Sequence, residues 1–172
     1  MKKMINVIMV VMMVFSVAGC SAKSTESNAQ PQGESVVQTA QVDLKNVLSD
    51  INTQYADVTG NLRELSDVAE LEKYYAVPTG AVKQFGAEIG SDTNAPVEIV
   101  LIEANDEASA EQIKQKMDIR YNSIYSMYAS YSAEQLDTVK ACKVEVNGNF
   151  VTMVVAPDYE GIMNIVNKAI AV

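Results

Sequence analysis

The side chains that could do chemistry in this 172-residue chain are two cysteines, eight tyrosines, several serines and 22 carboxylates, because histidine and tryptophan are absent. Without an imidazole the chain cannot build a Ser-His-Asp or Cys-His nucleophile, nor a zinc site with histidine ligands. Two thiols, Cys20 and Cys142, are too few for a four-thiolate zinc site or a disulfide framework. No calcium-loop or phosphate-loop pattern is present. We therefore expect no catalytic set, no metal site and no cofactor.

Cys142 lies in an alternating segment, on the side shared by the apolar residues. A reactive thiol needs a basic neighbourhood, and Lys140 and Lys143 are close in sequence. The alternation nevertheless places the thiol on the apolar face, where a free cysteine is usually buried. We expect a buried core thiol, and an intermolecular disulfide is the alternative.

Cys20 ends a very different segment. Lys2 and Lys3 form a positive start, residues 5–15 are apolar except for Asn6, and small residues follow. This pattern is typical of a secretory signal peptide, and it is too short and too abruptly ended for a good transmembrane helix. We predict a signal peptide over residues 1–19.

The residues Val17-Ala18-Gly19-Cys20 resemble the lipobox of bacterial lipoproteins. The resemblance implies that the Cys20 thiol receives a diacylglyceryl group, with palmitate as an expected acyl chain, and that signal peptidase II cuts before it. Two acyl chains anchor a protein stably. We expect a lipid-anchored protein of the cell envelope, on the outer face of the cytoplasmic membrane. The alternative is an ordinary cleaved signal with an incidental cysteine.

Residues 20–41 follow as the lipidated cysteine and a flexible tether, rich in Ser, Gln, Thr and Asn. Cleavage before Cys20 would remove two of the 13 basic residues and none of the 22 acidic ones, which changes the net charge from −9 to −11. A surface this acidic disfavours nucleic-acid binding, which needs contacts to phosphates.

Four tyrosines on one predicted helix form a stripe, and two more precede it in the chain. Such a stripe could line a ligand groove, because tyrosine combines an apolar ring with a polar tip. The alternative is that the rings seal the helix against a sheet. The candidate groove residues are Tyr121, Tyr125, Tyr128, Tyr131, Tyr74 and Tyr75.

The apolar periodicity from residue 42 onward predicts the elements that position these side chains. Helices are expected over about 41–57, from Asp67 to Tyr74, from Asp106 or Asn105 to Tyr131, from Ser132 to Lys140, and after Asp158. Strands are expected over 82–89 and 97–104 and in a hairpin over 142–155 that turns at Asn147-Gly148-Asn149. The hairpin alternation puts Cys142, Val144, Val146, Val151, Met153 and Val155 on one face.

This order predicts a single globular α+β domain over residues 42–172. N-terminal helices precede two strand-strand-helix units, and an antiparallel sheet has helices packed mainly on one face.

Three segments carry a resemblance to a known family: residues 97–107 (VEIVLIEANDE) with the helix after them, the junction 131–136 (YSAEQL), and the hairpin 144–151 (VEVNGNFV). In order and spacing the domain resembles domain-of-unknown-function family 4358, found in lipoproteins of Gram-positive bacteria. The resemblance implies the fold and the lipoprotein setting, and it supplies no catalytic residues.

Two functions follow as hypotheses. The first is a non-catalytic binding or interaction domain at the envelope, held to the membrane through lipid on Cys20, with an unknown protein, polymer or small ligand as partner. The second is a small envelope hydrolase that uses carboxylates or a Ser-Lys pair. The helix serines Ser123, Ser126, Ser130 and Ser132 have no histidine to activate them, and no motif supports the pair.

Overall fold

The computed structural model describes residues 41–90 and 96–171. The expected signal peptide, Cys20 and all of the expected tether except Gln41 lie outside the described residues. Among the helices in the described part of the chain, none is long and apolar enough to cross a membrane.

The elements follow the expected order, with a strand and short helical turns added. They are α1 (Leu44–Gln54), α2 (Ala56–Thr59), β1 (Leu62–Glu64), α3 (Val68–Tyr75), η1 (Thr79–Ala81), β2 (Val82–Gly90), β3 (Glu98–Ala104), α4 (Glu107–Tyr131), α5 (Ala133–Ala141), β4 (Lys143–Asn147), β5 (Phe150–Val155) and α6 (Tyr159–Ile170). The expected α+β class is confirmed.

The five strands form one sheet in the order β1-β2-β3-β5-β4, in which every neighbouring pair is antiparallel. The β4–β5 hairpin has the expected assignment of residues to faces, because Val144 lies opposite Met153 and Val146 opposite Val151. Gly148 sits in its turn with a φ of +56°, a conformation that glycine adopts without steric cost. β3 and β5 pair with each other, so they join the β2–β3 pair to the β4–β5 hairpin.

Side-chain caps begin three of the described helices at the expected residues. Asp67, Asp106 and Ser132 each accept a hydrogen bond from a backbone N–H in the first turn of their helix. The first helix is shorter than expected, because Asp43 caps it and Tyr55 separates α1 from α2. Asp158 precedes α6 as expected but makes no side-chain capping bond.

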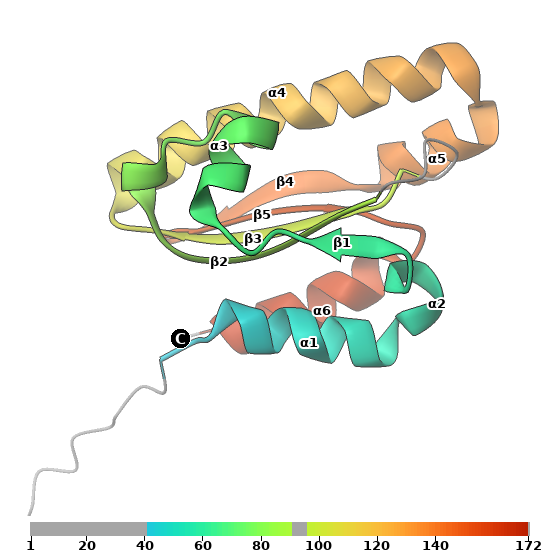
Figure 1. The fold of residues 1–172 in the computed structure, drawn as a ribbon. Coiled ribbons are helices and arrows are strands. Elements are labelled where there is room, and N and C mark those ends of the chain that lie inside the picture. Colours follow the sequence, from blue (N-terminus) through green and yellow to red (C-terminus); the bar gives the residue numbers. More distant parts are fainter. Residues whose placement is uncertain (1–40, 91–95, 172) are drawn as a thin grey trace, which may run out of the picture. The chain divides into compact units, whose positions relative to one another are not determined.

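The helices cover both faces of the sheet, whereas the sequence led us to expect them mainly on one. Figure 1 shows α1 and α6 on one side and α3, α4 and α5 on the other. The reason lies in β3, where all seven residues are buried. Ile99 and Leu101 face one helical layer and Val100 and Ile102 face the other, so both faces of the central strand are apolar and both need a cover.

Candidate binding groove

One edge of the sheet is only partly covered. β1 pairs with Glu88, Ile89 and Gly90 at the end of β2, and the Leu65 N–H then donates to the Ala87 carbonyl at 2.9 Å. Beyond this point the chain turns away into α3, so the first half of β2 has no strand on its outer side among the described residues. Because backbone groups alternate with a period of two, the N–H and C=O of Phe85 point outward in the same direction as the Ala87 carbonyl.

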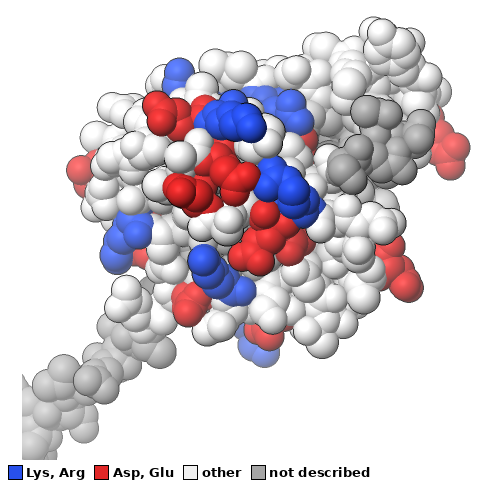
Figure 2. Space-filling view, viewed as in Figure 1, with Lys and Arg blue, Asp and Glu red and all other residues white. Residues whose placement is uncertain are grey.

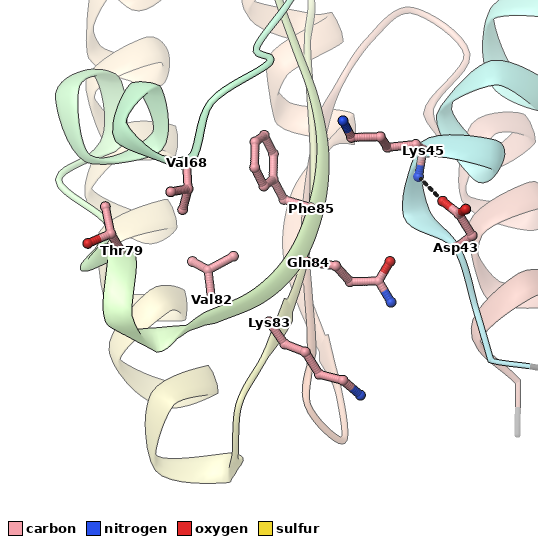
Figure 3. Close-up of a pocket in the computed structure, with 8 residues that line it drawn as sticks. All are labelled: Asp43, Lys45, Val68, Thr79, Val82, Lys83, Gln84 and Phe85. Carbon is pink, nitrogen blue, oxygen red and sulfur yellow. Dashed lines mark hydrogen bonds between the residues drawn. The ribbon is translucent and has the colours of Figure 1, made fainter.

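A groove of about 380 Å³ lies across this open edge. Its lining residues come from the start of α1, the start of α3, η1 and β2: Asp43, Lys45, Val68, Thr79, Val82, Lys83, Gln84 and Phe85. Figure 3 shows Val68, Val82 and Phe85 on one side of the β2 ribbon and Gln84, Lys45 and Asp43 on the other. The groove therefore offers an apolar wall, a polar wall and a free strand edge between them.

The polar wall is held in place by the Gln84 side chain. Its Oε1 accepts a hydrogen bond from the Leu44 N–H at 3.1 Å, and its Nε2 donates to the Val42 carbonyl at 2.7 Å. Nε2 also donates to Oε2 of the buried Glu103 at 2.5 Å. One carboxamide thus ties the entry of α1 to two strands of the sheet.

A β-bulge shapes the same stretch, because the β2–β3 register shifts between Val82 and Gln84. The extra residue, Lys83, pairs with Glu103 at 2.6 Å. Lys45 makes no ion pair with any described residue, although its own N–H donates to the Asp43 carboxylate at 2.9 Å. The charge that Lys45 brings to the rim of the groove is therefore not neutralised by a partner in the described chain.

Charge on the face seen in Figure 2 is mixed. Lysine and arginine side chains are interspersed with aspartate and glutamate rather than gathered into a patch of one sign. The ion pairs of the described residues include Arg63–Glu70 and Arg120–Glu98. No group of three or more potential metal ligands from Cys, Asp and Glu occurs within residues 41–90 and 96–171.

The six tyrosines named from the sequence do not form one continuous surface. Tyr75 and Tyr128 are buried with the core, whereas Tyr131 is 84% exposed. The Tyr121 hydroxyl donates to the Val139 carbonyl at 2.9 Å, so this ring fastens α4 to α5. Tyr125 and Tyr74 are about as exposed as each other and lie on different helices, α4 and α3.

Tyr75 and its neighbours belong to a polar cluster inside the α3–α4 layer. The Tyr75 hydroxyl and the Arg120 guanidinium both donate to the Glu98 carboxylate, and Arg120 also lies over the Tyr75 ring. Burial raises the pKa of Tyr75, and the Glu98 charge adds to that shift. These groups satisfy one another, so the cluster joins β3 to the helices that cover it.

Cys142 is a buried free thiol, as expected. Its Sγ lies 3.2 Å from the Thr138 carbonyl and 3.4 Å from the Ala156 N–H. Burial raises the pKa of Cys142, although the Ala156 N–H opposes the shift. A thiol with this environment is a poor nucleophile and is shielded from a second chain.

Three of the four helix serines make hydrogen bonds to the backbone. The hydroxyls of Ser126 and Ser130 donate to backbone carbonyls one turn earlier in α4, and Ser132 caps α5.

The groove itself was not predicted from the sequence, because it depends on where β1 stops. The only local signal is Phe85, the aromatic residue of β2.

The family model described as "Domain of unknown function (DUF4358)" matches residues 54–156, which is more than half of the chain. The match spans the whole sheet together with α3, α4 and α5, and it leaves out α6 and nearly all of α1. No curated protein and no solved structure matches the chain. The groove and its free strand edge thus lie mainly within the matched region, and on this match the chain belongs to the DUF4358 family.

Proposed function

We propose that this protein is a lipid-anchored, non-catalytic binding domain of the cell envelope, and that it binds an extended segment of a partner protein along the open edge of β2. The anchor would be lipid on Cys20, after removal of the signal peptide 1–19, with the domain on the outer face of the cytoplasmic membrane. The tether would give the domain reach from the lipid surface.

The observation that carries the binding proposal is the outward-facing backbone of Phe85 beside an apolar wall. A free strand edge recognises another extended chain through main-chain hydrogen bonds, and a neighbouring pocket selects its side chains. Val68, Val82 and Phe85 would receive an apolar side chain of the added segment. This combination favours a protein segment over a sugar polymer, because only a polypeptide supplies both a main chain that pairs with the strand edge and an apolar side chain for the neighbouring wall.

Lys45 adds a preference in charge. Its ammonium group is on the polar wall and has no ion-pair partner among the described residues, so it is available to a carboxylate. We expect the bound segment to carry an acidic residue on the side that faces α1 and an apolar residue on the side that faces α3.

The hydrolase alternative needs a lysine beside a serine hydroxyl, or two carboxylates converging on a cavity. The residues that line the groove include one threonine, two lysines and one aspartate, and the Lys83 amine is engaged with Glu103. No observation favours this alternative over binding.

The anchor is tested with the Cys20→Ala variant of the full chain, produced in a bacterium that makes lipoproteins. The wild type should incorporate the lipid label and be recovered in the membrane fraction, and the variant should do neither. Lipid labelling that persists in Cys20→Ala contradicts the anchor without bearing on the groove.

The groove is tested by photo-crosslinking in intact cells. A photoreactive residue replaces Thr79 in the groove, and the matched control replaces the exposed Gln115 on α4. We expect adducts from Thr79 alone, mapped by mass spectrometry to one short segment, and their loss when Val82→Glu or Lys45→Glu is added. Equal adducts from both positions, or adducts that survive both substitutions, contradict the proposal. Circular dichroism checks that each variant is folded.

A further inference from the structure

A buried carboxyl group joins α1 to the sheet. Glu88 lies in β2 on the face that α1 covers, and the residue is 6% exposed. The Asn52 carboxamide of α1 donates from Nδ2 to Glu88 Oε1 at 2.6 Å. The two residues are 36 positions apart in the chain, so this bond fixes the helix against the strand.

The remaining oxygen of each group has no partner in the described part of the molecule. Asn52 Oδ1 and Glu88 Oε2 are both buried, and neither makes a hydrogen bond. With Glu88 ionised, both atoms are acceptors, and a buried acceptor without a donor is costly. A single proton on Glu88 Oε2 removes both deficits, because the new O–H can donate to Asn52 Oδ1.

We propose that Glu88 keeps its proton in the folded protein at pH values where an exposed glutamate is ionised, and that the resulting two-point pair with Asn52 is a pH-sensitive latch holding α1 on the sheet. In this pair the carboxamide N–H donates to one carboxyl oxygen and the carboxyl O–H donates to the carboxamide oxygen. Loss of the proton leaves one hydrogen bond and a buried negative charge.

The groups that face Glu88 from the neighbouring strands and from α1 are an acidic residue, an apolar residue and an uncharged amide. β1 places Glu64 directly opposite, β3 places the apolar Ile99 opposite on the other side, and α1 contributes the uncharged Asn52. Burial raises the pKa of Glu88 above its ordinary value of 4.5, the Asn52 hydrogen bond opposes this, and the Glu64 charge adds to the rise. No described lysine or arginine forms an ion pair with Glu88.

The direction of the pH effect follows from the raised pKa. A folded-state pKa above the unfolded value means that the latch contributes fully below pH 4.5 and is lost as the pH rises through the folded pKa. The first turn of α1 carries Lys45, and Asp43 caps it, so the latched helix is also one wall of the groove. A pH above the folded-state pKa of Glu88 should therefore loosen α1 while the rest of the sheet stays paired.

The test is a pH titration of the full chain, followed through the side-chain carboxyl carbon of Glu88 by NMR. We expect a midpoint above 4.5, and a midpoint that moves down in Glu64→Gln, which removes the opposing charge. Amide hydrogen exchange of Leu48 and Ile51 should rise above that midpoint by more than the intrinsic pH dependence. In Glu88→Gln, which keeps a neutral donor and acceptor, this additional rise should disappear.

A Glu88 midpoint at or below 4.5 overturns the proposal, and this readout needs no variant. So does an exchange profile of α1 that has the same pH dependence in wild type and Glu88→Gln. Neither measurement involves a bound partner, so the outcome is independent of the proposed binding function.

Discussion

The Tyr55 hydroxyl fills the space in which a β-carbon at position 161 would lie, so any residue other than Gly161 would overlap the phenol oxygen. The contact joins the α1–α2 junction to α6, and it brings the hydroxyl next to the Asp158 carboxylate. Burial raises the pKa of Tyr55, and the Asp158 charge adds to the shift. Gly161 is therefore a packing requirement in a helix, where glycine is otherwise unfavourable.

This contact predicts that Gly161→Ala is destabilising although alanine favours helix. Overpacking of this kind typically costs about 1–3 kcal/mol, measured as the change in free energy of unfolding in urea. The same substitution should cost less in a Tyr55→Phe background, because the overlapping oxygen is gone. Equal costs in both backgrounds would show that the hydroxyl is not the obstacle.

A second glycine lies where α1 approaches the sheet closely. A β-carbon at Gly86 would lie 2.6 Å from the Leu44 carbonyl oxygen, whereas a β-carbon at Gly80 would meet nothing within 4 Å. We expect Gly86→Ala to lower the free energy of unfolding by about 1–3 kcal/mol and Gly80→Ala to change it by about 0.5 kcal/mol or less. Urea titration of both variants checks this, and similar losses at the two sites would contradict it.

The sequence predicted the helix caps and the hairpin well, because each depends on residues close together in the chain. Asp67, Asp106 and Ser132 were recognisable from local spacing, and the alternation of 142–155 predicted which residues of the hairpin share a face. β1 has only three residues and no alternation long enough to detect, and it exists because Glu88–Gly90 offer it an edge.

The two helical layers were predictable in principle. Apart from Glu98 and Glu103, the run over residues 97–104 is apolar on both alternating sets, which indicates a strand buried on both faces rather than one. The groove and the Asn52–Glu88 pair were not predictable, because each brings together residues of α1 and β2 that are separated by more than thirty positions. Neither residue of the pair is unusual in its local sequence.

The ion pair of Arg120 with Glu98 should matter more for stability than the surface pairs. The Glu98 side chain is 8% exposed, and both Arg120 and Tyr75 donate to its carboxylate. Removing one partner of a buried pair leaves the other charge buried and unpaired, which costs about 3 kcal/mol. We expect that loss for Arg120→Met and a smaller one for the double variant Glu98→Gln with Arg120→Met.

Calorimetry of the two variants checks the order of their unfolding temperatures. The i, i+4 pair Lys114–Asp118, whose side chains are both more than a third exposed, supplies the control. Lys114→Met should change stability by about 0.5 kcal/mol or less. If the double variant is less stable than Arg120→Met, the cost of removing Arg120 does not come from an unpaired Glu98 charge.

Tyr159 makes a further tyrosine–carboxylate hydrogen bond between two elements, and the carboxylate that it contacts acts on stability in the opposite pH direction from Glu88. Its hydroxyl donates to Glu145 Oε1 at 2.7 Å, which links α6 to β4. This hydrogen bond lowers the pKa of Glu145, burial opposes the shift, and Lys143 adds to the lowering. Because the folded pKa is depressed, the contribution is present above the ordinary value of 4.5 and is lost as the pH falls through the lowered pKa.

Tyr159→Phe should therefore lose about 1–2 kcal/mol at neutral pH, and its deficit against the wild type should shrink as the solution is acidified below pH 4.5. Urea unfolding at several pH values measures both effects. Tyr131→Phe is the matched control, because Tyr131 is 84% exposed, and it should follow the wild type at every pH. A Tyr159→Phe deficit that stays constant on acidification would assign the loss to packing of the ring, since only the hydrogen bond to an ionised Glu145 can make it depend on pH.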